Sequence, residues 1–165
     1  MLHSKTLKRF ALVIVIVMAS SLFLLARTNE AVSYPTGYLK WTHLKQATQP
    51  AESSPNNKPR IYHIYGNDSA LAGLRNNKQF ADGSSFVVDF FETKDANGKL
   101  SEAARAQVAV MVKDGKRYAK TGGWGFEQFK GDSQIESMLN ADGAAKCYAC
   151  HGQKETSGVF TTYNK

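Results

Sequence analysis

The sequence contains only two cysteines, and both stand beside a histidine in one short motif near the end of the chain. Cys147, Cys150 and His151 form a Cys-x-x-Cys-His sequence, with 14 residues after the histidine. This spacing has three common uses: a disulfide or redox pair, a zinc site, or covalent attachment of haem c. A redox pair of the thioredoxin type follows an early strand of a βαβ unit, whereas this pair lies close to the C-terminus.

The zinc and haem interpretations differ in how many of these residues they use. A structural zinc site takes four ligands, so the motif would need a fourth from His43 or His63. Haem c uses the whole motif, because both thiols form thioethers and the adjacent imidazole binds the iron. We therefore expect one haem, covalently attached at Cys147 and Cys150, with His151 as the proximal iron ligand.

The first 31 residues have the composition of a targeting segment. A basic start with Lys5, Lys8 and Arg9 precedes 17 uncharged residues at positions 10–26. As a helix this stretch would span about 25 Å at roughly 1.5 Å per residue, close to a bilayer core. We expect export to the periplasm, with residues 1–31 acting as a signal peptide or a retained membrane anchor, and one domain over residues 32–165.

The charge of the exported part is modest. Four of the 21 Lys and Arg residues and one of the 14 Asp and Glu residues lie before residue 32, which leaves a net charge of +4. The basic residues are dispersed, so no nucleic-acid partner is expected.

Turn signals and alternating apolar residues predict an α+β fold, mainly an antiparallel β-sheet with peripheral helices. Pro35 favours a short helix followed by a strand within residues 34–45, and Asn67 or Asp68 can cap a helix over residues 69–77. The sequence also predicts a helix over residues 132–140. Four further strands are expected at 61–65, 84–94, 106–114 and 122–130.

A sixth ligand to the iron would have to come from upstream of the motif. The candidates are His43, His63 and Met111, since no Met follows Met138 and no His follows His151. Each has a simpler interpretation as a packing or surface residue, which predicts five-coordinate iron with an open position. Arg117 could pair with a haem carboxylate, although an exposed arginine is the more ordinary interpretation.

The strand expected at residues 84–94 has one apolar face. Because side chains alternate along a strand, Phe86, Val88 and Phe90 share a face that carries no acid. Over an open iron, such a face would exclude water and anions and admit a small uncharged diatomic gas. The alternative is that these side chains are plain sheet core.

Four segments in order resemble the cytochrome P-460 family, which includes the cytochromes c′-beta: YPTGYLKWTHLK, HIYGNDSALAGLRNNKQFADGS, MVKDGKRYAKTGGWGFEQFKGDS and CYACH. The resemblance runs from about Tyr34 to Tyr163. It implies a small, mainly antiparallel sheet, a homodimer, and a five-coordinate haem with His151 as the proximal ligand.

The chain departs from the hydroxylamine-oxidising members of this family at one position. Those members cross-link a lysine to the haem edge, in the strand after a D-G-[ST] turn. Here the turn ends at Ser84, and Val88 stands where that lysine would be. Lys94 lies six residues further along. This departure favours resemblance to the cytochromes c′-beta, which lack the cross-link and bind nitric oxide under aromatic rings.

The sequence thus predicts a gas-binding haem protein, for nitric oxide or a similar small gas, and leans away from an enzyme. The alternative is a P-460-type enzyme that oxidises hydroxylamine or nitric oxide, and a plain electron carrier ranks third. A redox partner protein would fit any of these functions.

Overall fold

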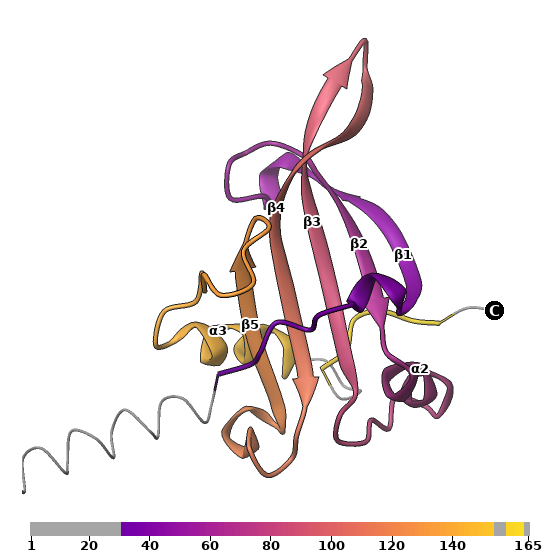
Figure 1. Cartoon of the computed structure of the whole chain (residues 1–165), viewed down its shortest axis with the longest axis vertical. Helices are drawn as coiled ribbons and strands as arrows, with labels where there is room; N and C mark the ends of the chain where they lie inside the picture. The colour runs from indigo at the N-terminus through magenta and orange to yellow at the C-terminus, as the bar shows by residue number, and fades with distance from the viewer. Residues whose placement is uncertain (1–30, 154–157, 164–165) are drawn as a thin grey trace, which may run out of the picture. The chain divides into compact units, whose positions relative to one another are not determined.

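A single antiparallel sheet organises the computed structural model, which describes residues 31–153 and 158–163. Its five strands are hydrogen-bonded in chain order, β1-β2-β3-β4-β5 (Figure 1). The strands are β1 (Thr42–Gln49), β2 (Arg60–Gly66), β3 (Ser85–Ala96), β4 (Lys99–Lys113) and β5 (Trp124–Lys130). The helices are α2 (Asp68–Arg75) and α3 (Gly143–His151), with short 3₁₀ turns η1 (Tyr38–Lys40), η2 (Ala51–Ser53) and η3 (Ala119–Thr121). The predicted α+β class is confirmed.

Local capping explains one helix that the sequence predicted correctly. The Asn67 side chain accepts a hydrogen bond from the Ala70 N–H at 2.9 Å and so caps the start of α2. An N-cap of this kind satisfies a backbone donor that the first turn of a helix leaves without a partner.

The helix predicted over residues 132–140 is wrong, because this segment forms turns and a single bridge to β5. The Ser133 hydroxyl accepts hydrogen bonds from the backbone N–H groups of Ile135 and Glu136. Such local bonds compete with the helical pattern. Ile135 is also 91% exposed, so packing of an apolar face does not stabilise a helix here.

Two further elements differ from the sequence-based expectation. β4 begins at Lys99 rather than residue 106, so β3 and β4 continue as a two-stranded hairpin beyond their neighbours (Figure 1). The helix α3, which carries the Cys-x-x-Cys-His motif, was not predicted from the sequence.

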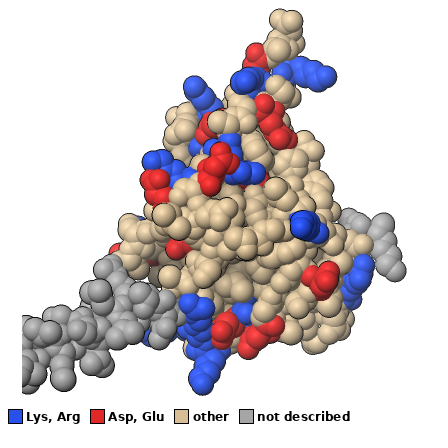
Figure 2. Space-filling model, in the orientation of Figure 1, with Lys and Arg blue, Asp and Glu red and all other residues tan. Residues whose placement is uncertain are grey.

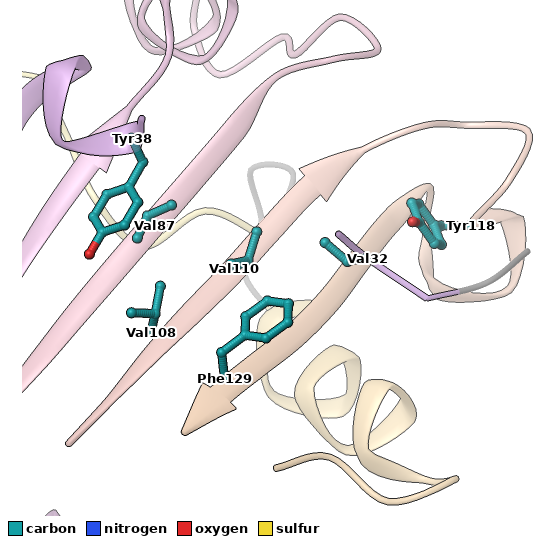
Figure 3. Close-up of a cluster of buried hydrophobic side chains, with 7 residues drawn as sticks. All are labelled: Val32, Tyr38, Val87, Val108, Val110, Tyr118 and Phe129. Atoms are coloured by element: carbon teal, nitrogen blue, oxygen red, sulfur yellow. The ribbon is translucent and has the colours of Figure 1, made fainter. Parts of the chain in front are cut away.

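The first face of the sheet carries an apolar core under the segment that precedes β1. Figure 3 shows its seven buried side chains: Val32, Tyr38, Val87, Val108, Val110, Tyr118 and Phe129. Asp89 lies on this face and is 1% exposed. Its carboxylate accepts hydrogen bonds from Tyr38 Oη at 2.6 Å and from Arg105 Nε at 2.7 Å.

The second face of the sheet is covered by α3 and the C-terminal residues, and α2 packs at its border (Figure 1). A second buried cluster lies here: Ala70, Phe86, Met111, Trp124, Phe126 and Val159. The alternation of β3 therefore sends Phe86 and Asp89 to opposite sides, as the sequence predicted for this strand.

Charged side chains of both signs are interspersed on the face shown in Figure 2. No helix within residues 31–153 and 158–163 has the length and apolar character needed to cross a membrane. The predicted targeting segment and the domain boundary at residues 31 and 32 stay predictions, since residues 1–30 lie outside the part that the structure describes.

Candidate functional site

The helix α3 brings the three residues of the motif to one end of the second face. Positions separated by three or four residues lie on the same side of a helix, as Cys147 does with Cys150 and His151. Gly143 lets this helix begin against Leu139, because a β-carbon at Gly143 would meet the Leu139 side chain at 2.7 Å. Both cysteines are free thiols. Cys150 is exposed, while burial raises the pKa of the half-buried Cys147.

His151 is oriented by the segment that follows it. Its Nδ1 lies 2.7 Å from the carbonyl oxygen of Gly158. Because a carbonyl can only accept, Nδ1 carries the proton and Nε2 keeps a free lone pair. The rings of Phe126 and Phe160 pack on the imidazole at centroid distances of 5.2 and 4.7 Å. Histidines that ligate metals commonly have their second nitrogen held in this way, so the arrangement suits the predicted role of His151.

A cavity of about 290 Å³ lies on the second face of the sheet and contacts both the motif and the strands. Cys147 and His151 line it from α3, and Phe86, Val88 and Phe90 line it from β3. The structure thus brings the predicted attachment residue, the predicted iron ligand and the predicted distal side chains to one apolar space. Cys150 does not line this cavity.

The three β3 side chains are held differently. Phe86 is 5% exposed and packs on Phe80 and Trp124 at centroid distances of 5.5 and 6.3 Å. Phe90 is half-buried, and its ring packs on Tyr62 at a centroid distance of 5.6 Å. Phe86 is therefore both core and cavity wall, whereas Phe90 is mainly cavity wall.

The candidates for a sixth ligand are divided between the two faces. Met111 lines the cavity. His43 Nε2 lies 3.0 Å from His63 Nδ1, and His63 Nε2 lies 2.7 Å from Glu102 Oε1. His63 alternates with Tyr62 and so points to the first face, away from the cavity.

A zinc site at the motif would need His43 or His63 as its fourth ligand, and both side chains lie on the first face. Among the residues that the structure describes, no group of three or more His, Cys, Asp or Glu side chains is arranged to hold a metal ion.

Sequence reasoning missed the C-terminal contribution to the cavity. Val159, Phe160 and Thr161 line it, although no periodicity or motif marks them in the sequence. Lys78 Nζ donates to the Val159 carbonyl at 2.9 Å and fixes this segment beside His151. Tyr62 and Ile64 also line the cavity, and they could have been found from their alternation with His63.

These residues fit a haem. The cavity is bordered mainly by aliphatic and aromatic side chains, which suits a porphyrin, and a thiol and an imidazole with a free nitrogen reach into it. The Thr161 hydroxyl is buried there and has no hydrogen-bond partner in the described part of the chain, which suits a polar edge of a bound group.

The antiparallel sheet, the apolar cavity and the Cys-x-x-Cys-His motif beside it are together typical of a haem protein. The family model of cytochrome P460 matches residues 35–161, so the chain belongs to the cytochrome P460 family. The family implies a haem cofactor. No curated protein matches the chain significantly.

Proposed function

We propose that this protein is an exported cytochrome that holds one covalent haem and binds nitric oxide or a similar small gas. The observation that carries the proposal is the single apolar cavity shared by Cys147, His151 and the side chains of Phe86, Val88 and Phe90. In this proposal the two cysteines attach the haem, and His151 Nε2 binds its iron. The haem would supply the iron that binds the gas.

The chain's own residues set what can reach that position. Val88 and Phe90 offer neither a charge nor a hydrogen-bond donor, so water and anions gain nothing by entering. A small uncharged gas loses little hydration on entry. His43 and His63 are hydrogen-bonded to each other on the first face, away from the cavity. This position supports five-coordinate iron, because neither imidazole faces the proposed haem.

Among the three candidates for a sixth iron ligand, Met111 lines the cavity, so Met111→Leu is the decisive variant for the coordination number of the iron. We expect His151→Ala to destroy the native spectrum of the purified protein. Met111→Leu and His63→Ala should leave a high-spin ferrous spectrum that changes on addition of nitric oxide. A parent spectrum that is low-spin and becomes high-spin in Met111→Leu would overturn the five-coordinate assignment.

Hydroxylamine oxidation is the alternative, favoured by family membership alone. Val88 sits between Ile64 and Ala109 in the sheet register, where the resemblance expects the cross-linking lysine. Lys94 pairs with Ser101 in the outer hairpin, the part of β3 and β4 that continues beyond the neighbouring strands. This hairpin lies beyond the part of β3 that borders the cavity. We expect no turnover, or very slow turnover, of hydroxylamine with an artificial electron acceptor. Rapid turnover, or a Soret band near the 460 nm that the family name suggests, would reverse this order.

The resemblance also leads us to propose a homodimer located in the periplasm. Light scattering coupled to size-exclusion chromatography tests the homodimer, and a monomer at micromolar concentration would contradict it. Fractionation of expressing cells tests the location, and haem protein recovered only from the cytoplasm would contradict a periplasmic protein.

A further inference from the structure

A second cavity, of about 280 Å³, adjoins the one that we assign to the haem. Leu44 and Lys45 of β1 line it on one side, and Phe160, Thr161 and Thr162 line it on the other. Phe160 and Thr161 border both cavities. The two spaces are therefore neighbours across these two side chains.

A β-bulge brings the charge of Lys45 to this cavity. The register of β1 shifts between His43 and Lys45, so Leu44 is an extra residue without a partner in β2. In a regular strand Leu44 and Lys45 would point to opposite faces. After the shift Lys45 pairs with Ile64, whose side chain lines the first cavity, and directly paired residues share a face. Bulges commonly redirect a side chain next to a functional site.

Two polar side chains at this cavity, Lys45 and Thr161, have no polar side-chain partner among the residues that the structure describes. The Thr161 hydroxyl oxygen is buried and makes no hydrogen bond to any residue within 31–153 and 158–163. Lys45 is exposed, and it takes part in no ion pair with the residues that the structure describes. A buried hydroxyl without a partner calls for an explanation, and a bound acceptor supplies one.

The chemistry of haem indicates what that acceptor is. The two vinyl groups, which become thioethers, lie on one edge of the porphyrin, and the two carboxylates lie on the opposite edge. α3 carries the cysteines and packs on β5, whereas Lys45 stands on β1 at the other end of the sheet. A porphyrin attached at α3 would thus direct its carboxylates away from β5.

We propose that Lys45 and Thr161 form the subsite that binds a haem carboxylate, through the Lys45 ammonium and the Thr161 hydroxyl. This inference rests on the proposed haem attachment. It replaces Arg117 in that role, because the Arg117 guanidinium lies over the Tyr118 ring at 5.2 Å and Arg117 lines neither cavity. Besides Lys45, the titratable side chains that border the two cavities are Tyr62, Glu127, Cys147 and His151.

The test measures the midpoint potential of the holoprotein as a function of pH. An ionised carboxylate stabilises ferric iron, so the potential falls as the pH rises through the carboxylate pKa. Because a nearby cation lowers that pKa, Lys45→Met should move the fall to higher pH by about one unit. Thr161→Val should move it in the same direction by less, and Lys45→Arg should keep the parent profile. Lys94→Met, which removes an equal charge from the outer hairpin, is the matched control and should also keep it.

The outcomes separate this inference from the proposed function. Five-coordinate variants at Lys45 and Thr161 with the parent profile would overturn the subsite and leave gas binding untouched. A parent protein without covalent haem would overturn the proposed function itself. A holoprotein crystal structure gives an independent answer: a carboxylate oxygen about 3 Å from Lys45 Nζ or Thr161 Oγ1 supports the subsite, and both carboxylates elsewhere overturn it.

Discussion

Phe90 and Phe86 border the same cavity, yet their replacement should have different consequences. Phe90 is half-buried with Tyr62 as its ring partner, so Phe90→Ala removes cavity wall at a small cost in stability. A ring over the iron must move aside when a diatomic binds, and its removal should speed carbon monoxide entry severalfold in the ferrous protein. Phe86→Ala should instead lower the free energy of unfolding by about 3–5 kcal/mol, because Phe86 packs on Phe80 and Trp124.

Flash photolysis and urea denaturation measure these two effects. Phe91→Ala is the matched control, since Phe91 belongs to the same strand but contacts His63 on the first face. If Phe90→Ala and the control bind carbon monoxide at the same rate as the parent, Phe90 does not restrict access to the iron.

Each cysteine should contribute one of the two bonds that attach the haem. Each thiol forms one thioether in the proposed attachment, so Cys147→Ala and Cys150→Ala should each retain at most one bond to the haem. Acid-acetone extraction should release the haem completely from the double variant and incompletely or not at all from the parent. Haem that stays with the double variant after extraction would contradict covalent attachment through this motif.

At the scale of elements, the sequence predicted the strands well because alternation is a local property. The faces of β3 follow from the order of Phe86, Val88, Asp89 and Phe90 alone. The helix α3 was not predictable in this way, because no side chain caps its start and its position depends on packing against β5.

The remaining errors and omissions concern segments whose structure depends on distant contacts. Residues 132–140 have helical apolar spacing, but Ser133 bonds to the local backbone and no partner covers Ile135. The C-terminal residues that complete the cavity are held by Lys78, which lies 81 positions earlier in the chain. No sequence pattern reports such a contact.

Lys78 gives an element-scale prediction, since its ammonium fixes Val159 beside the Gly158 carbonyl that holds His151. Lys78→Met should lower the free energy of unfolding by about 1.5–3 kcal/mol, the usual contribution of a hydrogen bond to a charged group. It should also shift the iron–histidine stretching frequency in the resonance Raman spectrum of the ferrous protein. Lys94→Met serves as the control. A stretching frequency equal to that of the parent would show that Lys78 supports the fold without orienting His151.

At the scale of the whole molecule, β3 joins two faces with different chemistry. Val88 and Phe90 border the cavity, while Asp89 between them is buried on the other face. Asp89 binds Arg105 of β4 and Tyr38 of η1, and Arg105 also pairs with Asp132 after β5. Burial and the hydrogen bond to Asp89 raise the pKa of Tyr38, so its hydroxyl stays protonated and keeps donating.

This network predicts that Arg105 supports the fold from the face opposite the proposed haem. Arg105→Met would leave the Asp89 carboxylate buried without its cation, which typically costs about 3–5 kcal/mol. Asp89→Asn combined with Arg105→Met should recover part of that loss, because a neutral amide is easier to bury than a carboxylate.

Urea denaturation of the single and double variants measures the difference. Arg60→Met is the control, because it breaks the pair with Glu92 at 2.7 Å on the neighbouring strands. Equal unfolding free energies for the single and double variants would show that the Asp89 charge is not what Arg105 compensates. If the folded Arg105→Met protein binds carbon monoxide at the parent rate, the first face contributes stability alone, and the geometry of Val88 and Phe90 is set by the cavity side of the sheet.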